Sequence, residues 1–396
     1  MQICIKPKKL SGSVKAVSSK SYAHRAIICA ALADKPTEIL TDILSDDIKA
    51  TLRCVKALGA ETEKIPGGVK VTPFKLPREN AVLDCGESGS TARFMLAVAA
   101  ALPVSAELTG SGRLPERPMN VLVHALKEGG AEIDGDFLPI KVKGKIHSGL
   151  YELRGDISSQ FITGLMLALA ATEGKSEIHI ISAMESAAYV DITADVLNRF
   201  GIEILKTNDG YTIFGGKYIS PGKITVEGDW SNAAYFLAAS RMGSSVSISG
   251  LNLASRQGDK VFTQVIAQDT IDASQIPDLV PVIAVYATSK KSVTKIVGAK
   301  RLRIKESDRI KTTAALINAL GGKAEETEEG LTVYGTGKLK GGTADGAGDH
   351  RIVMSAAVAA LICEKEVIIN GAEAVNKSYP TFFDDYKKLG GEINVR

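Results

Sequence analysis

No apolar run in this chain is long enough to cross a bilayer, because the two longest cover only 94–104 and 161–171. The first ten residues lack the apolar core of a signal peptide. Neither sign of charge dominates, since 48 basic and 45 acidic side chains leave +3 over 396 residues. This excludes the basic stripe of a general nucleic-acid binder, although a local cationic site remains compatible with it. We therefore expect a cytoplasmic protein without a membrane or nucleic-acid partner.

Cysteines are few and scattered, and no C-x-x-C pair occurs among them. That spacing excludes a zinc ribbon, and the odd number gives no disulfide framework. We interpret them as small buried hydrophobes and expect no bound metal. The five positions are Cys4, Cys29, Cys54, Cys85 and Cys363.

A helix ending in glycine recurs along the chain, followed each time by a short strand. The glycine suits the left-handed residue that closes a helix. Gly59 and Gly130 are 71 residues apart, as are Gly130 and Gly201, and the pattern returns at Gly321 and Gly390. A sixth copy, with the glycine replaced, is expected within 258–273.

A second helix repeats in the same rhythm and is apolar on nearly every side, which is typical of a buried helix. Six units of about 66 residues exceed the usual period of a solenoid. We therefore expect two domains, each with three units around three buried helices. The fifth unit begins early, which indicates that the fourth has lost a hairpin. The buried copies cover 21–33, 90–102, 158–171, 231–242, 276–287 and 349–362.

The buried helices begin with polar or charged residues. A helix start offers free backbone N–H groups and a partial positive charge, and so can bind an anion. A single serine or aspartate there is more simply a helix cap, but its recurrence at equivalent ends favours a shared anion site. The G-E-S-G-S-T-A-R loop at 86–93 lacks the G-K-[S/T] ending of a nucleotide-hydrolysing P-loop.

Basic side chains recur at the starts of both the buried and the exposed helices. Two unpaired cations about 6 Å apart repel by roughly 3 kcal/mol at an effective dielectric constant of about 20. A cluster of them therefore predicts a cleft for a small, multiply charged anion. The cations concerned are Lys20, Arg25, Arg93, Arg117, Lys305, Arg309, Arg351 and Lys377.

In these residues the chain resembles the 5-enolpyruvylshikimate-3-phosphate synthases (3-phosphoshikimate 1-carboxyvinyltransferases) of the enolpyruvyl transferase family. The similarity runs from Lys6-Pro7 to Tyr379-Pro380, and the combination of motifs in this order is highly specific. The motifs are S-K-S-x-x-x-R (19–25), S-G-S-T-A-R (88–93), E-R-P (116–118), S-S-Q-F (158–161), V-E-G-D (226–229), I-P-D (276–278), K-E-S-D-R (305–309) and G-D-H-R (348–351).

The resemblance implies an α/β (α+β) fold, an inside-out α/β barrel. It would have two similar pseudo-threefold domains, each of three βαβαββ-like units around buried parallel helices. One domain would comprise 1–12 plus 228–396, with the first strand near 2–8, and the other 13–227. The active site would lie in the cleft between them. The implied reaction moves the carboxyvinyl group of phosphoenolpyruvate to the 5-hydroxyl of shikimate 3-phosphate, in aromatic amino-acid biosynthesis, without a cofactor or a metal.

The resemblance also implies the site residues. Asp278, Glu306 and Lys20 would transfer protons. Shikimate 3-phosphate would be bound by Lys20, Ser21, Arg25, Ser158, Ser159, Gln160, Ser186, Tyr189, Asp278 and Lys305. Phosphoenolpyruvate would be bound by Lys20, Gly89, Arg93, Arg117, Gln160, Arg309, His350, Arg351 and Lys377.

Two positions depart from the family pattern, because Glu87 and Arg301 stand where asparagine is common, and either could change substrate affinity. Gly89 would leave room for glyphosate, so we predict inhibition; unchanged turnover at millimolar inhibitor would contradict this.

Repulsion between cations should hold the domains apart until substrates bind. We expect a monomer.

Two alternatives remain open. One is the related enzyme that transfers carboxyvinyl to UDP-N-acetylglucosamine, which usually has Lys-Asn where this chain has Lys20-Ser21. That enzyme also has a reactive cysteine before the region of Arg117, and 109–118 contains none. The other is a non-catalytic protein that binds phosphate or RNA ends. Asp278 and Glu306 oppose it, because carboxylates weaken an anion site unless they transfer protons.

Overall fold

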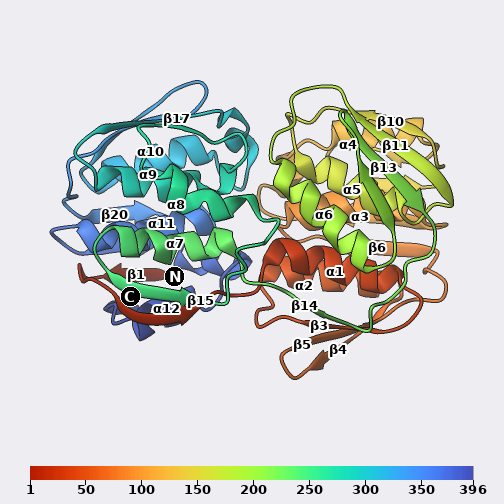
Figure 1. The fold of residues 1–396 in the computed structure, drawn as a ribbon, viewed down its shortest axis with the longest axis horizontal. Helices are drawn as coiled ribbons and strands as arrows, with labels where there is room; N and C mark the ends of the chain where they lie inside the picture. Colours follow the sequence, from red (N-terminus) through yellow and green to blue (C-terminus); the bar gives the residue numbers. More distant parts are fainter. Residues whose placement is uncertain (396) are drawn as a thin grey trace. The chain divides into compact units, whose positions relative to one another are not determined.

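The computed structural model describes residues 1–395 and divides the chain into two compact units. The continuous unit is Ser18–Glu227, and the discontinuous unit joins Met1–Val17 to the chain from Gly228 onward. Both consist of buried helices surrounded by small sheets (Figure 1). This is the inside-out α/β architecture that the family resemblance implies, and its two units match the two domains expected from the repeats.

The continuous unit contains three four-stranded sheets, ordered β14-β3-β5-β4, β6-β7-β9-β8 and β10-β11-β13-β12. In each sheet the first pair is parallel and the other two pairs are antiparallel. The strands are β3 (Thr37–Leu40), β4 (Glu61–Ile65), β5 (Gly68–Thr72), β6 (Asn80–Asp84), β7 (Ser105–Thr109), β8 (Glu132–Asp134), β9 (Ile140–Lys143), β10 (Leu150–Leu153), β11 (Gly174–Ile180), β12 (Glu203–Lys206), β13 (Gly210–Gly215) and β14 (Lys223–Thr225).

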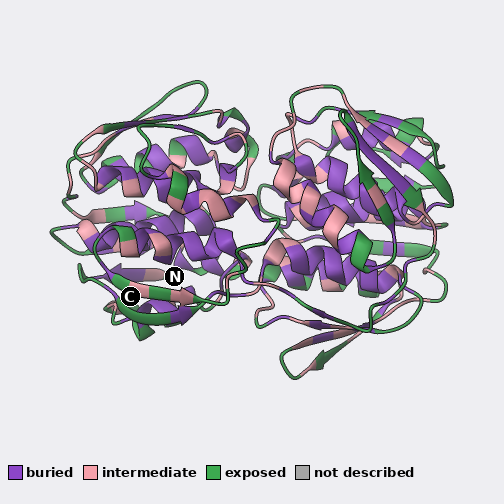
Figure 2. Cartoon of the chain, in the orientation of Figure 1, coloured by how far each residue is buried: buried purple, intermediate pink, exposed green. Residues whose placement is uncertain are grey.

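Three buried helices form the centre of this unit, α1 (Lys20–Leu32), α3 (Gly89–Ala101) and α5 (Ser159–Leu169). In α3 every residue except Ser90 is buried (Figure 2). Helices α3 and α5 approach closely at Gly164, where a Cβ atom would lie 2.7 Å from the Arg93 carbonyl oxygen. The outer helices are α2 (Asp46–Ala57), α4 (Asn120–Glu128) and α6 (Ala187–Arg199).

The discontinuous unit repeats this plan around α7 (Trp230–Arg241), α9 (Val280–Thr288) and α11 (His350–Ala359). Its sheets are ordered β16-β17-β19-β18, β20-β21-β1-β22 and β15-β2. The last sheet has two strands, which confirms that the fourth repeat lacks a hairpin. The remaining elements are α8 (Phe262–Val265), α10 (Arg309–Ala319), α12 (Phe382–Lys388), β1 (Gln2–Ile5), β2 (Ser11–Lys15), β15 (Ser245–Ser249), β16 (Thr270–Asp272), β17 (Val293–Val297), β18 (Lys323–Glu326), β19 (Leu331–Tyr334), β20 (Gly342–Asp345), β21 (Val367–Asn370) and β22 (Ile393–Val395).

Strand pairing explains where the units begin. Strand β1 pairs with β21 and β22, which places it with the C-terminal half as expected. Strand β2 pairs in parallel with β15, so residues 13–17 also belong to the discontinuous unit. The first boundary therefore follows Val17, not position 12 as expected. The second boundary falls between Glu227 and Gly228.

The repeated glycines close their helices as the sequence predicts. Gly59, Gly130, Gly201, Gly321 and Gly390 all have positive φ angles, between 77° and 112°. Such angles strain residues with a Cβ atom. Each glycine therefore ends an outer helix and turns the chain into the following strand. Across the described residues, no helix is both long and apolar enough to span a membrane.

Candidate active site

Arg25 is buried on α1 and is held by neutral groups. Its Nε donates to Thr193 Oγ1 at 2.7 Å, and Nη1 donates to the Ser21 carbonyl at 2.7 Å. Nη2 donates to the Tyr189 carbonyl at 2.8 Å and to Thr163 Oγ1 at 3.2 Å. Burial lowers the pKa of Arg25 to about 10. These bonds orient the guanidinium without cancelling its charge.

Lys20 is the first residue of α1, and its Nζ lies 2.7 Å from Asp47 Oδ2 on α2. Asp47 belongs to the acidic first turn of α2, where its negative charge interacts favourably with the positive end of the helix dipole. Ser21 and Arg25 lie on the same helix start. The structure therefore brings Ser21 and Tyr189 to the Arg25 guanidinium, and Lys20 begins the same helix.

Gly89 begins α3, directly beside the guanidinium of Arg117. A Cβ atom at Gly89 would lie 2.7 Å from Arg117 Nη1, so only glycine leaves this space open. Ser88 caps the helix, because its Oγ accepts from the Thr91 N–H at 3.2 Å. The backbone N–H groups of this helix start and a buried guanidinium are thus neighbours, an arrangement that suits an anion.

Arg93 lies one turn further along α3 and donates through Nη1 to Gln160 Oε1 on α5. The Gln160 Nε2 donates in turn to Ser90 Oγ at 2.9 Å. Ser158 caps α5 by accepting from the Gln160 N–H at 3.3 Å, and Ser159 follows it. Gln160 therefore connects the starts of two buried helices.

Ser186 precedes α6 in a left-handed conformation, with φ of 54°. Few residues other than glycine adopt this conformation, and strained residues of this kind cluster at functional sites. Ser186 is buried, and Tyr189 directly follows the alanine pair at 187–188. The Tyr189 carbonyl accepts from Arg25, and the Tyr189 N–H donates to the Ser186 carbonyl at 3.1 Å.

In the discontinuous unit, Arg309 is buried among three carboxylates. Its Nη1 donates to Asp278 Oδ1 at 2.8 Å, and Nη2 donates to Glu306 Oε2 at 2.7 Å. Its Nε donates to Asp349 Oδ2 at 2.8 Å. Burial lowers the pKa of Arg309, but these three carboxylates outweigh it and raise the pKa above its usual value.

Arg351 shares one of these carboxylates. Its Nη2 donates to Asp278 Oδ2 at 2.8 Å, and Nη1 donates to Ser231 Oγ at 2.8 Å and to the Asp278 carbonyl at 3.1 Å. Burial alone would raise the pKa of Asp278, but the charges of Arg351 and Arg309, with a smaller contribution from Lys305, lower it far below its usual range. Asp278 is therefore ionised at neutral pH.

Asp349 fixes the start of α11 and Arg309 together. Its Oδ1 accepts from the Arg351 N–H at 2.9 Å, and its Oδ2 accepts from Ser307 Oγ at 3.0 Å. Burial raises its pKa, whereas Arg309 and then His350 lower it, with a net decrease. His350 is buried, and its Nδ1 lies 3.8 Å from Asp349 Oδ1. Lys377 lies at the same helix start, since its Nζ donates to the Gly348 carbonyl at 2.6 Å.

Lys305 is half-buried at the end of a short 3₁₀ helix, η4 (Lys300–Ile304). Removal from water is the largest influence and lowers its pKa, Asp278 and Glu306 raise it, and Arg301 and Arg309 lower it. The net pKa of Lys305 is about 7. A lysine with this pKa can bind a phosphate or exchange a proton near neutrality.

The sequence argument treated the cations as unpaired, and for three of them this was wrong. Lys20, Arg309 and Arg351 have carboxylate partners. Sequence reasoning also missed the residues that provide or support this pairing. Asp47 and Asp349 looked like ordinary residues of a helix start, and their partners are 27 and 40 residues away in the chain.

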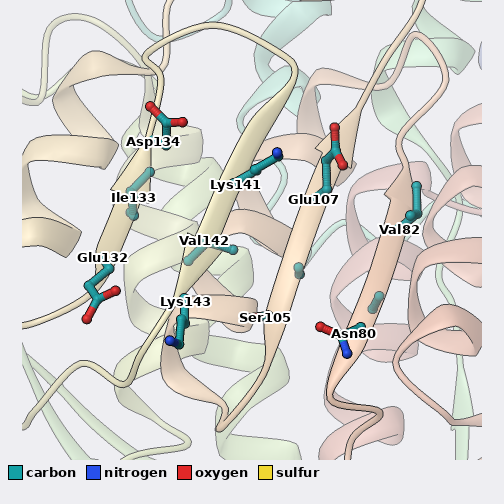
Figure 3. A pocket seen from close by; sticks show the side chains of 12 residues that line it. Asn80, Val82, Ser105, Glu107, Glu132, Ile133, Asp134, Lys141, Val142 and Lys143 are labelled. Carbon is teal, nitrogen blue, oxygen red and sulfur yellow. The ribbon is translucent and has the colours of Figure 1, made fainter.

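The candidate residues lie apart from the hollowed outer face of the sheet β6-β7-β9-β8 (Figure 3). On that face Glu107 pairs with Lys141, and Glu132 pairs with Lys143, in register across neighbouring strands. Such alternating charge is typical of a solvated sheet face. In the described part of the chain, no group of three or more histidine, cysteine or acidic side chains is arranged to hold a metal ion.

The family model described as EPSP synthase (3-phosphoshikimate 1-carboxyvinyltransferase) matches residues 5–270 and 266–386. The 3-phosphoshikimate 1-carboxyvinyltransferase of Clostridium acetobutylicum is 42% identical, covering 99% of this chain and 98% of its own. The protein of the same name from Clostridium novyi is 40% identical, with the same coverage. Among solved structures, an EPSP synthase from Acinetobacter baumannii matches with a TM-score of 0.83 and 24% identity over all of both chains, which supports the fold.

Proposed function

Because the chain belongs to the EPSP synthase family, we infer that it transfers the carboxyvinyl group of phosphoenolpyruvate to the 5-hydroxyl of shikimate 3-phosphate, releasing phosphate. It acts in the shikimate pathway of aromatic amino-acid biosynthesis. The observation that carries this function is the similarity over the whole length to relatives named for that activity, at about 40% identity.

We propose that shikimate 3-phosphate binds the residues gathered around Arg25. The buried charge of Arg25 is held by hydroxyls and carbonyls, so a phosphate can supply the compensating charge. Ser186 adds a hydroxyl held in a strained conformation. Lys305, whose pKa is about 7, is proposed to add its ammonium group. The full proposed set is Lys20, Ser21, Arg25, Ser158, Ser159, Gln160, Ser186, Tyr189, Asp278 and Lys305.

For phosphoenolpyruvate we propose binding mainly by arginine side chains. Arg117 beside Gly89 offers paired donors, and so do Arg309 and Arg351, which suit planar carboxylates and phosphates. Together the substrates carry two carboxylates and two phosphates, about −5 to −6 in total. This charge matches the cations proposed to bind them. The full proposed set is Lys20, Gly89, Arg93, Arg117, Gln160, Arg309, His350, Arg351 and Lys377.

The reaction needs proton transfer in two stages. In the addition, the 5-oxygen bonds to C2 of phosphoenolpyruvate as its proton leaves and C3 gains a proton. In the elimination, the C–O bond to phosphate breaks and C3 loses a proton, restoring the double bond. We propose that Asp278 takes the hydroxyl proton and that Glu306 or Lys20 serves C3. Fixed cations stabilise the tetrahedral intermediate.

Substrate binding should prepare Asp278 for this role. In the unliganded protein Arg351 and Arg309 hold its pKa far below the usual range, so it is a weak base. A phosphoenolpyruvate anion on the same two guanidinium groups offsets their positive charge at Asp278. The pKa of Asp278 therefore rises when the substrate binds, and its carboxylate becomes a stronger base.

We propose that the protein acts in the cytoplasm as a monomer, without a cofactor, metal or nucleic-acid partner. In the part of the chain that the structure describes, all five cysteines are buried thiols, which suits folding in a reducing compartment. No further partner is needed for the residues proposed above, because all of them belong to this chain.

A phosphate-release assay with each acceptor tests the function. Release that requires both phosphoenolpyruvate and shikimate 3-phosphate is expected. Release with UDP-N-acetylglucosamine would instead identify the related transferase. Absence of release with either acceptor, despite phosphoenolpyruvate binding, would favour the non-catalytic phosphate-binding alternative.

A further inference from the structure

Two threonines that neither the motifs nor the proposed substrate sets include hold the guanidinium of Arg25. Thr193 lies on α6 and Thr163 on α5, and both residues are fully buried. Thr193 Oγ1 accepts from Arg25 Nε at 2.7 Å, and Thr163 Oγ1 accepts from Arg25 Nη2 at 3.2 Å. A hydroxyl so far from water needs hydrogen bonds that offset the cost of its burial, and Arg25 supplies one to each.

The two hydroxyls form one directed chain of hydrogen bonds. Thr193 Oγ1 donates to the Tyr189 carbonyl at 3.1 Å, one turn earlier in α6. The hydroxyl oxygens of Thr163 and Thr193 lie 2.9 Å apart. A hydroxyl has a single hydrogen, and a guanidinium can only donate. Because Thr193 gives its hydrogen to the carbonyl, Thr163 donates to Thr193, and both oxygens turn lone pairs to Arg25.

Two backbone carbonyls and an aromatic ring complete the surroundings of Arg25. Nη1 donates to the Ser21 carbonyl at 2.7 Å, and Nη2 donates to the Tyr189 carbonyl at 2.8 Å. The guanidinium lies over the ring of Phe94 on α3, with Cζ 5.0 Å from the ring centroid. The four hydrogen bonds use four of the five guanidinium hydrogens, so one hydrogen on Nη1 is left for a ligand.

We propose that Thr163 and Thr193 are positioning residues that aim this Nη1 hydrogen of Arg25 at shikimate 3-phosphate. Their oxygens hold the Nε and Nη2 side of the guanidinium, so its plane is set before the substrate binds. Because both hydroxyls are neutral, they leave the charge of Arg25 to the substrate anion, which a carboxylate partner would offset. This inference rests on the proposed role of Arg25 in binding that substrate, and it adds two residues that act through Arg25.

The test replaces each threonine by valine, which keeps the shape of the side chain and removes the hydroxyl. Calorimetric titration of the whole protein with shikimate 3-phosphate gives the dissociation constant. Thr193→Val should raise it by about tenfold, the scale of one hydrogen bond to a charged group. Thr163→Val should raise it by a smaller factor, because Arg25 Nη2 keeps the Tyr189 carbonyl as an acceptor.

Three further readouts separate positioning from a loss of packing. Thr193→Ser keeps the hydroxyl and should restore the affinity that Thr193→Val loses. Adding Thr193→Val to Arg25→Met should weaken binding no further than Arg25→Met alone, because the threonine acts through that arginine. In steady-state kinetics, Thr193→Val should raise the KM for shikimate 3-phosphate, whereas kcat and the KM for phosphoenolpyruvate should change by less than about threefold.

Thr172→Val is the matched control, because Thr172 is also a buried threonine of the continuous unit. Its Oγ1 donates to the Leu169 carbonyl at 2.8 Å, at the end of α5. The control therefore loses a buried hydrogen bond to a carbonyl, as Thr193→Val does, but this bond does not involve Arg25. It should lower the melting temperature without changing the dissociation constant for shikimate 3-phosphate.

An unchanged dissociation constant in Thr193→Val, or a further loss when Thr193→Val is added to Arg25→Met, would overturn the inference. An equal loss of affinity in Thr172→Val would overturn it as well. If Thr193→Val fails to fold, Thr163→Val decides alone, and an unchanged dissociation constant refutes the proposal. Failure of the function itself would look different, because the wild-type protein would then release no phosphate with shikimate 3-phosphate.

Discussion

Arg25 in the continuous unit and Arg309 in the discontinuous unit are both buried beside a helix start, but their partners differ in charge. Hydroxyls and carbonyls hold Arg25, whereas three carboxylates hold Arg309. A buried cation with neutral partners keeps its attraction for an external anion. A cation among carboxylates is already neutralised, and its partners can exchange protons.

The difference divides the proposed work between the units. Arg25 of the continuous unit is held by neutral groups, which suits the binding of a phosphate. In the discontinuous unit Arg309 and Arg351 lie beside Asp278 and Glu306, so a substrate anion bound there is proposed to change the basicity of Asp278. Similar folds thus surround their buried arginines with different partners.

The sharpest test of this contrast is stability without substrate. Arg309→Met leaves Asp278, Glu306 and Asp349 without their shared counter-charge, and the free energy of unfolding should fall by about 3–5 kcal/mol. Chemical denaturation measures it, with Lys311→Met on the exposed face of α10 as control. A loss below about 1 kcal/mol would show that the three carboxylates do not need the charge of Arg309, and would contradict its contrast with Arg25.

Arg25→Met should have the opposite pattern, with a smaller loss of stability and a clear loss of substrate binding. No carboxylate is left unpaired, so stability falls less than in Arg309→Met, whereas shikimate 3-phosphate binding weakens by roughly 2–4 kcal/mol. Calorimetric titration measures this, with the exposed Arg53→Met as control. Unchanged affinity would exclude Arg25 from the phosphate site.

Arg117→Ala separates the two substrates within the continuous unit. Loss of its charged donors should weaken phosphoenolpyruvate binding by about 1.5–3 kcal/mol and affect shikimate 3-phosphate far less. Kinetics with each substrate varied in turn checks this, against the exposed Arg113→Ala. Equal losses for the two substrates would refute the assignment.

The pKa of Lys305 predicts that the affinity for shikimate 3-phosphate depends on pH. Its pKa of about 7 means that the ammonium loses its proton as pH rises, so affinity for shikimate 3-phosphate should fall above pH 7, by up to about tenfold per pH unit. Lys305→Arg stays protonated and should abolish this decline. A decline of equal size in both proteins would assign it to another group.

Gly89→Ala should have the smallest effect. The new Cβ atom meets the flexible end of Arg117, which can shift, so the KM for phosphoenolpyruvate should rise only a few-fold, about 0.5–1 kcal/mol. Gly216→Ala is the control, since nothing lies within 4 Å of its Cβ position. An equal rise in the control would show that the space beside Arg117 at Gly89 is not needed for phosphoenolpyruvate binding.

The sequence predicted the repeats, the buried helices and the glycine-closed outer helices. Each of these leaves a local signal in the sequence, either a hydrophobic periodicity or a residue that caps a helix. It did not predict the pairing of β2 with β15, since one short strand resembles another until its partner is known. Nor did it predict that Asp349 holds Arg309. A capping aspartate looks the same in sequence whether or not a distant guanidinium also binds it.

A structure determined with shikimate 3-phosphate and glyphosate bound would test the central claim most directly. The account predicts that the bound ligands contact the side chains of Arg25, Lys20, Arg351 and Lys305. Ligands that contact neither Arg25 nor Arg351 would contradict it.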